Sequence, residues 1–556
     1  MKTLASFPYH RILWVVGIAM LLLLQPIAVT RAQDATPAAD EWTVIGSLPV
    51  ELTGTPTGDQ TLQLAGPVSD LRSLDPAFAR DLTAAFFARQ MFSGLMTFDA
   101  EMNAVPALAE TIEISPDGTT YRFTIRDGAT FHDGRPITAD DVVASYTRAL
   151  NPATAGGDIT ALGGPTFLSD IVGADALIRG ETDTLEGVQA IDDRTVEITL
   201  KAPRSTFLMK LAGAPAAIVD STEVGEADWW RTPNGSGPFR VEEWVPEDHM
   251  TLKRFDSYLP DPAYLETVNF RLGPMAGNAF NLFQSGQIDM TELPGTWLSR
   301  IEDDPNFAGQ LQTSPMLSTS YITFRDDVAP MDDLAVRRAI ALAFPREKLA
   351  EVSLAGLDRP AFGLLPPGLL GREWDVANSE YDLEAAKAML ATSSYAQSGE
   401  PIPPIQVFGV GPWVAEILRE TVGEDLGLEF EVIDTDWPTL IERLGKQDLP
   451  GFELLWQADY PDPESFLWSL FGSDSPDNYS GYSNPEFDAL LDEARNTLDL
   501  DERAAIYAEA HQLLMDDGVV LPVVHDVQYS VSKPWVKGIE LTPLGLLDLS
   551  SIWLER

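Results

Sequence analysis

The chain has 556 residues, 45% of them hydrophobic and 22% charged, so it is a globular protein too long for one ordinary core, and we expect two or three domains. Its 37 Lys and Arg residues against 85 Asp and Glu residues give a net charge of −48, which excludes the basic surface of a nucleic-acid-binding protein. The absence of cysteine excludes disulfides, thiolate metal sites and cysteine nucleophiles.

Residues 1–32 have the pattern of a signal peptide. Lys2 and Arg11 precede the apolar run 12–24, and Thr30-Arg31-Ala32 supplies a small-residue cleavage site after Ala32. We therefore predict export, with an uncleaved anchor as the alternative, and no lipoprotein anchor because there is no cysteine. The following residues 33–58, rich in Thr, Pro, Ala and Asp, are predicted to form a flexible linker.

The first half of the chain is rich in predicted strands. Helical spacing of apolar residues predicts a helix over 82–98, and Thr138 with Asp141 three residues later predicts the start of another. Alternating apolar residues predict strands over 61–66, 120–126, 188–200 (with a turn at Asp192-Asp193) and 239–245. The turn at 234–238 lacks the lysine and following helix of a phosphate loop, so we interpret it as structural.

From about Asn278 the pattern changes to alternating helices and strands, which is typical of an α/β protein. Asp332 or Asp333, Asp382 and Asn484 are predicted helix N-caps, the last followed by a proline. The predicted elements are helices at 278–284, 413–426 and 501–516, strands at 428–433 and 519–524, and short strands and turns over 536–554.

The stretch 454–467 combines an apolar run, an acid and a sharp break. Leu454-Leu455-Trp456-Gln457-Ala458-Asp459 is followed by Tyr460-Pro461-Asp462-Pro463, which predicts a strand that stops abruptly. An aspartate at the exposed end of a buried strand, beside a tryptophan, can hold a cationic ligand group. From these residues alone, a ligand-binding Asp459 and an ordinary turn acid both remain open.

No motif predicts catalysis or metal binding. The chain has no Gly-x-Ser-x-Gly, no His-Glu-x-x-His and no Walker A lysine loop, and acid pairs such as Asp140/Asp141 carry little information in so acidic a chain. His132-Asp133-Gly134 could be a metal or acid–base element, but we interpret it as a turn. Because these motifs are missing, we predict that the chain is not an enzyme, and a secreted two-carboxylate glycosidase is the weakest alternative. Because the chain has only five histidines and no cysteine, we predict no resident metal and no cofactor.

Four separated blocks together resemble the family 5 extracellular solute-binding proteins, the oligopeptide-, dipeptide- and nickel-binding components of ABC importers. The most specific block runs from Tyr121 to Val143 and contains nearly the whole family signature. The resemblance covers the chain after about Thr61, in the family's order. The other blocks are Leu74-Asp75-Pro76 with Leu108-Ala109-Glu110, Gly235–Phe239 with Ser285–Asp289, and 454–467 continuing through Tyr482–Pro485 to Leu521-Pro522-Val523.

The resemblance implies an α/β fold, a two-lobed periplasmic-binding-protein clamshell (class II) with an extra domain inserted in the N-terminal lobe. Lobe I would combine 59–76, 190–275 and 526–556. The inserted domain would be 77–189, and lobe II 276–525. This arrangement agrees with the strand-rich first half and the helix–strand second half.

The resemblance also implies the site. In peptide-binding members the acid of a Trp-x-x-Asp pattern at this place pairs with the α-ammonium of the ligand, here Asp459, with Trp456 as an apolar wall. The flanking backbone, at Leu455 and Gln457, would add the ligand as an extra strand. Two departures from the family, Phe324-Arg325 and Pro345-Arg346, concern ligand-facing details of the second lobe.

The implied function is capture of peptides between the lobes and their delivery to a membrane permease. The partners would be a peptide and an ABC permease whose ATPase subunits are separate chains, with membrane contact through the permease and no nucleic acid. We expect an exported monomer in the periplasm or at the outer face of the cytoplasmic membrane. The alternatives are another solute (an oligosaccharide, a metal chelate or an opine-like molecule) and, less favoured, a secreted hydrolase.

Overall fold

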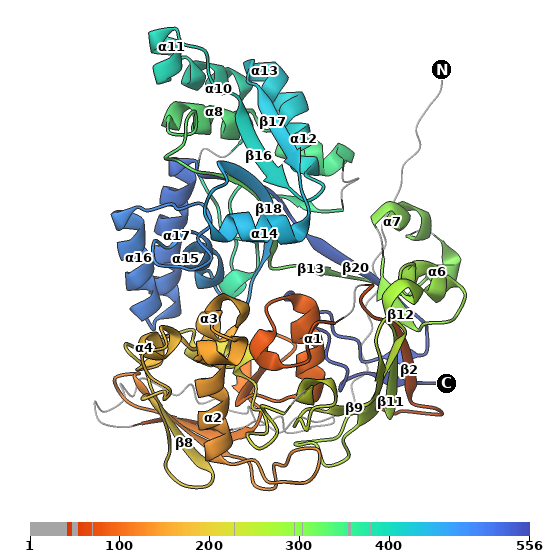
Figure 1. The fold of residues 1–556 in the computed structure, drawn as a ribbon. Coiled ribbons are helices and arrows are strands. Elements are labelled where there is room, and N and C mark those ends of the chain that lie inside the picture. Colours follow the sequence, from red (N-terminus) through yellow and green to blue (C-terminus); the bar gives the residue numbers. More distant parts are fainter. Residues whose placement is uncertain are drawn as a thin grey trace, which may run out of the picture. The chain divides into compact units, whose positions relative to one another are not determined.

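Three large β-sheets organise the chain (Figure 1). The computed structural model describes residues 42–46, 54–68, 71–226, 228–293, 295–302, 304–353, 357–377 and 380–556. The predicted signal peptide, residues 1–32, lies outside these ranges. Within them, no helix has the length and apolar character needed to cross a membrane.

The five-stranded sheet is antiparallel and contains the signature segment. Tyr121, Phe123 and Ile125 alternate toward a buried core, as predicted, and the predicted capping box of Thr138 and Asp141 starts helix α2. In sheet order the strands are β1 (Thr43–Gly46), β5 (Ala109–Ile114), β6 (Thr120–Ile125), β8 (Thr195–Thr199) and β7 (Val188–Ala190). Its helices are α2 (Ala139–Leu150), α3 (Gly164–Leu168), α4 (Ala174–Ile178) and α5 (Phe207–Lys210). We call this part of the chain the five-stranded region.

The seven-stranded sheet mixes parallel and antiparallel pairs. Strand β2 runs parallel to both neighbours, and helix α1 (Leu82–Met91) covers one face with Phe87 and Met91. In sheet order its strands are β13 (Leu311–Pro315), β20 (Val527–Ser532), β12 (Met290–Glu292), β2 (Thr61–Ala65), β11 (Thr267–Arg271), β10 (His249–Arg254) and β9 (Phe239–Val245). Helices α6 (Ala279–Gln284) and α7 (Gly295–Ile301) pack near β12 and β20.

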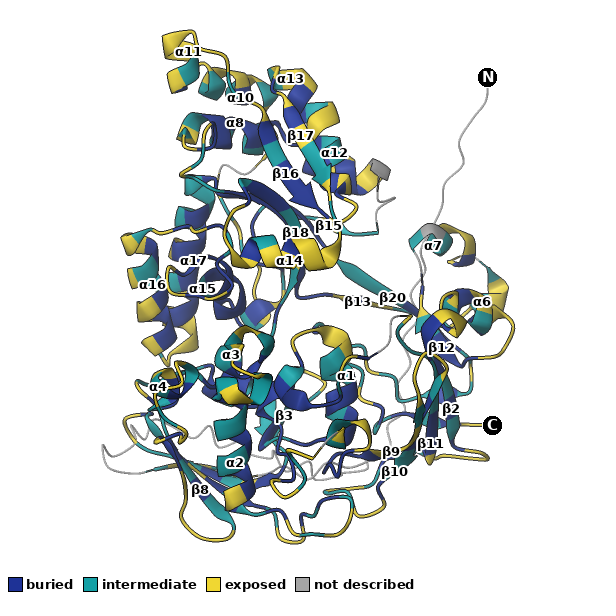
Figure 2. Cartoon of the chain, in the orientation of Figure 1, coloured by how far each residue is buried: buried dark blue, intermediate teal, exposed yellow. Residues whose placement is uncertain are grey.

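The six-stranded sheet carries helices on both faces. One face packs on α8 (Leu334–Ala343), α10 (Leu383–Leu390) and α12 (Trp413–Leu418), the other on α15 (Glu464–Phe471), α16 (Pro485–Asn496) and α17 (Leu500–Asp517). Helix α16 buries Phe487, Leu491 and Ala494 and exposes its opposite side (Figure 2). In sheet order the strands are β15 (Arg359–Pro360), β19 (Val520–His525), β14 (Ser318–Phe324), β18 (Gly451–Gln457), β16 (Ile405–Gly409) and β17 (Phe430–Asp434).

The predicted N-caps form in this part of the chain. The side chains of Asp333, Asp382 and Asn484 accept hydrogen bonds from the first turns of α8, α10 and α16. The predicted helix from Trp413 continues through the π-helical turn Arg419–Gly423 to α13. The remaining α-helices and strands are β3 (Met96–Phe98), β4 (Ala104–Pro106), α9 (Arg346–Lys348), α11 (Ser394–Ser398), α13 (Glu424–Leu426), α14 (Trp437–Gly445), β21 (Val536–Lys537) and β22 (Trp553–Leu554).

Two adjacent segments join the seven-stranded and six-stranded sheets. Strand β13 leads into β14 through 316–317, and β19 leads into β20 through Asp526. The segments are paired at the crossing, because the Met316 N–H donates to the Asp526 carbonyl (3.0 Å) and the Ser318 hydroxyl donates to the Asp526 carboxylate (2.6 Å). Figure 1 shows β13 and β20 side by side there. We call this pair of segments the double crossing. The chain passes from the seven-stranded sheet to the six-stranded sheet through one of them and returns through the other.

Several strands differ from the predictions. Thr43–Gly46, inside the predicted linker 33–58, forms the edge strand β1, because it pairs with the alternating strand β5. The predicted helix over 82–98 ends at Met91, since Ser93 turns to bond Ser236 and Met96 begins β3. Strand β8 pairs inside the five-stranded sheet, whereas β12 and β13 pair inside the seven-stranded one. The limits of the domains remain a prediction.

A buried ion pair supports the turn after β18. The Arg503 guanidinium in α17 contacts the Asp462 carboxylate, and both side chains are fully buried. Asp462 also accepts a hydrogen bond from the Glu464 N–H (3.0 Å) at the start of α15. Arg503 therefore neutralises the Asp462 carboxylate inside this turn.

Arg503→Met should lower the free energy of unfolding by about 3–5 kcal/mol, because it leaves the Asp462 carboxylate buried without its cation. Urea denaturation followed by tryptophan fluorescence measures the loss. Arg372→Met is the matched control: it removes the exposed pair with Asp501 and should cost no more than about 1 kcal/mol. Equal losses in the two variants would contradict this role of Arg503.

Candidate functional site

The predicted strand end is present, and hydrogen bonds fix the turn that follows it. Strand β18 ends at Gln457, and the Ala458 N–H donates to the Leu317 carbonyl (2.8 Å) beside the double crossing. The Ser465 hydroxyl accepts from the Asp459 N–H (2.8 Å), and the Ser465 carbonyl accepts from the Trp456 indole (2.7 Å). The backbone of Asp459 is thus held between β18 and α15.

The Asp459 carboxylate has no hydrogen-bond or ion-pair partner among the described residues, although the residue is half-buried. Burial raises its pKa to about 7, and the nearby Asp477 carboxylate adds to the rise, whereas Arg80 and Lys210 oppose it. Arg80 is itself 3.7 Å from Asp477. An enclosed acid without its own cation is suited to receive a positive group from a ligand.

The backbone of β18 offers an open edge next to this acid. β18 pairs with β14 along its whole length, but with β16 only at Phe452. The Ala458 N–H donates to the Leu317 carbonyl, and the Arg325 N–H donates to the Pro450 carbonyl. Because backbone groups along a strand point alternately to its two sides, the even-numbered residues of β18 direct their backbone hydrogen bonds to β14. Leu455 and Gln457 therefore direct their backbone N–H and C=O groups to the opposite edge, which no described strand covers.

The predicted site residues lie on two faces of β18. Leu455 is 52% exposed, and the side-chain nitrogen of Gln457 is buried without a hydrogen-bond partner in the described part of the chain. Trp456 points to the other face, where it packs against the core of α15, α16 and α17. The structure thus places Leu455, Gln457 and Asp459 along the open edge of β18, while Trp456 packs on the opposite face of the sheet.

Further exposed apolar residues follow the neighbouring parallel strands, and sequence reasoning missed them as site candidates. Trp413 begins α12 after β16, and Trp437 begins α14 after β17; they are 40% and 53% exposed. The Asp434 carboxylate ties the two loops by accepting from the Gly411 N–H (2.8 Å). Because the carboxyl ends of parallel strands point to the same end of a sheet, these tryptophans lie at the same end of the six-stranded sheet as Asp459. The available signals were the predicted strand 428–433 that precedes Trp437 and the predicted helix 413–426 that Trp413 begins.

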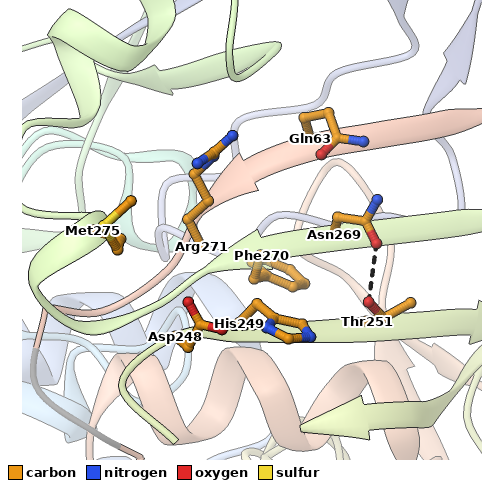
Figure 3. Close-up of a pocket in the computed structure, with 8 residues that line it drawn as sticks. All are labelled: Gln63, Asp248, His249, Thr251, Asn269, Phe270, Arg271 and Met275. Atoms are coloured by element: carbon orange, nitrogen blue, oxygen red, sulfur yellow. Dashed lines mark hydrogen bonds and ion pairs between the residues drawn. The ribbon is translucent and has the colours of Figure 1, made fainter. Parts of the chain in front are cut away.

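A separate groove lies elsewhere in the described residues. It occupies about 240 Å³ on the polar face of β2, β10 and β11 (Figure 3). Thr251 donates to Asn269 across it (3.0 Å), and His249 is flanked by Asp248 and Glu243. No residue of β18 lines this groove, so it is separate from the candidate site at Asp459.

The conspicuous histidine turn is structural. The His132 ring bonds the Gly237 carbonyl (3.0 Å), and burial lowers its pKa to about 4. Arg135 next to it bridges Asp141 and Asp220. Among the described residues, no three His, Asp or Glu side chains gather as metal ligands.

Three sheets, paired crossing strands and an open edge with an unpaired acid define an α/β protein with a candidate site for a solute. Residues 103–478 match the family model described as "Bacterial extracellular solute-binding proteins, family 5 Middle", so the chain belongs to this family. The family predicted from the signature segment is thereby confirmed.

Known relatives agree with this assignment. The chain is 30% identical to the "Probable deoxycholate-binding periplasmic protein YgiS" of Escherichia coli K12, over 88% of this chain and 92% of that one. It is 27% identical to the periplasmic oligopeptide-binding protein OppA of Escherichia coli K12, over 84% and 88%. The solved murein tripeptide binding protein MppA of Escherichia coli superposes with a TM-score of 0.77 at 25% identity, covering 90% of this chain and 99% of that one. The predicted α/β two-lobed clamshell fold is confirmed.

Asp459→Asn should stabilise the unliganded protein at pH 8 but not at pH 4. A carboxyl whose pKa is raised in the folded state keeps its proton longer than in the unfolded chain, so stability falls as pH rises from about 4 to about 7. The difference should be on the order of 2 kcal/mol, since partial exposure screens the charge. Urea midpoints of both proteins across this range measure it, and parallel profiles would contradict the raised pKa.

Proposed function

We propose that this chain is the extracytoplasmic binding protein of an ABC importer that captures peptides and delivers them to a membrane permease. One observation carries the proposal: the unpaired Asp459 carboxylate lies at the end of the open edge of β18. The acid offers a partner for a ligand ammonium group, and the edge offers backbone donors and acceptors for an extended chain. Membership of a solute-binding family supports the same class of function.

In this proposal the α-ammonium of the peptide pairs with Asp459, and its first residues run along Leu455 and Gln457. Backbone pairing reads no side chain, so peptides of varied sequence bind. Trp413, Trp437 and the exposed Leu455 side chain supply apolar contact for ligand side chains. The protein acts without catalysis, as an exported monomer, and ATP hydrolysis takes place on separate chains of the importer.

Deoxycholate is the second candidate, because a relative is named as a probable binder of it and because exposed tryptophans suit an apolar solute. Its carboxylate, however, would approach a chain of net charge −48 and an acid that lacks a described cation. Electrostatics therefore favours the peptide ammonium over the bile-acid anion. Calorimetry with deoxycholate, run beside the peptide titrations, separates the two.

Asp459→Ala should weaken binding of peptides with a free N-terminus by about 2–5 kcal/mol, as expected for losing one partner of a buried charge pair. Isothermal titration calorimetry with a defined peptide library measures the loss, and N-acetylated peptides should bind poorly to both proteins. Asp183→Ala, which removes an exposed acid, is the control and should bind like the parent. Equal affinities of the parent and Asp459→Ala would contradict the role of Asp459. Release of peptide or glycan fragments during incubation would favour a hydrolase.

N-methylation of the ligand should report the strand pairing. Methyl groups on ligand nitrogens that donate to Leu455 or Gln457 should each weaken binding about tenfold, the effect of about one backbone hydrogen bond. Methyl groups on the alternate nitrogens, which point away from β18, should have little effect. A scan that shows no alternation would exclude addition of the peptide to this edge.

A further inference from the structure

Tyr460, directly after the candidate ligand acid, belongs to the core of another part of the molecule. Its side chain is fully buried and packs in the hydrophobic cluster of the five-stranded region rather than in the core beneath β18. The rings of Tyr460 and Phe167 of α3 meet edge to face, 6.4 Å apart. The Tyr460 hydroxyl has no hydrogen-bond partner within the described residues, so packing of the ring accounts for this contact.

An ion cluster fixes the other end of the same turn to the same region. Lys210 of α5 is fully buried, and its Nζ lies 2.8 Å from the Glu464 carboxylate and 2.8 Å from Asp170. Thr206 donates a hydrogen bond to the other oxygen of Glu464 (2.6 Å). Arg495 of α16 contacts both acids, at 3.2 Å and 3.5 Å. The cluster therefore joins α5 of the five-stranded region to α15 and α16 of the six-stranded sheet.

These contacts bracket the turn from residue 460 to residue 464, and Asp459 directly precedes it. We propose that the five-stranded region positions the Asp459 carboxylate for the ligand, through the buried ring of Tyr460 and the Lys210–Glu464 ion pair. The region thereby becomes a positioning element of the binding site, although its sheet contributes no strand to it. This inference rests on the proposed function only in taking Asp459 as the ligand contact.

The charge of Asp459 can be observed without any ligand. The charged groups that act on its carboxyl are Asp477, Arg80 and Lys210. Removing the ring of Tyr460 admits water to the turn and relieves the burial, whereas removing the Lys210 charge withdraws a cation. The two changes therefore move the titration of Asp459 in opposite directions.

The experiment is a carbon-detected NMR titration of the full chain labelled with ¹³C-carboxyl aspartate, with the Asp459 signal assigned by its loss in Asp459→Asn. In the parent protein the midpoint should lie at about 7. Tyr460→Ala should lower it by about one pH unit or more, and Lys210→Met should raise it by roughly half a unit. Tyr460→Phe keeps the ring, and Lys201→Met removes the exposed pair with Asp175; both controls should titrate like the parent.

The affinity for a free-amine peptide should fall at least about tenfold in Tyr460→Ala and be restored in Tyr460→Phe. If Lys210→Met fails to fold, the double variant Lys210→Met/Glu464→Gln removes both charges of the pair and takes its place. An unchanged Asp459 titration in folded Tyr460→Ala and Lys210→Met or its replacement would overturn the inference. Shifted titrations in a protein that binds no peptide would reject the peptide but keep the positioning of Asp459.

Discussion

The register of β18 against β14 is the constraint on which the candidate site depends. Because even-numbered residues of β18 bond β14, the backbone groups of Leu455 and Gln457 face the open edge. A shift by one residue would turn them inward and would bury Leu455 instead of Trp456. The same register brings Ala458 to the Leu317 carbonyl and so fixes where the strand stops and where Asp459 begins the turn.

The distribution of charge around this strand end has a clear pattern. In a chain with 37 basic residues and 85 acids, three buried carboxylates near the turn receive cations: Asp462 from Arg503, and Glu464 and Asp170 from Lys210. Asp459 receives none among the described residues, and burial raises its pKa to about 7. The few basic residues near the turn thus pair with the acids that stabilise it, whereas the Asp459 carboxylate has no ion-pair partner among the described residues.

Local signals in the sequence predicted much of the fold. Caps at Asp333, Asp382 and Asn484, the alternation around Phe123 and the break at Pro461 follow from interactions within a few residues, and the structure contains them. The family signature, carried by the segment around Arg126 to Val143, was also identified. Asp459 was singled out because the break follows it, although its role as a ligand contact remains a prediction.

The missed features depend on contacts between distant segments. Strand β1 forms because it pairs with β5. Strand β12 forms because Met290 pairs with Leu64 of β2, which is far away in the sequence. No local sequence pattern indicates that Tyr460 packs in the core of the five-stranded region, because the sequence around a buried tyrosine does not show which core buries it. The exposed tryptophans after β16 and β17 became site candidates only once those strands were known to be parallel to β18.

The double crossing has a mechanical consequence for the ligand acid. Leu317, between β13 and β14, accepts from Ala458 and donates to Pro543. Asp459 therefore directly follows a residue that is hydrogen-bonded to the double crossing, which would be the pivot of a rotation between the two sheets. A point close to a pivot travels a short arc, whereas the far ends of helices travel long ones. If the two sheets rotate about this crossing, Asp459 moves little, and a solute bound to it as proposed would keep its charged end fixed while the rest of the site moves around it.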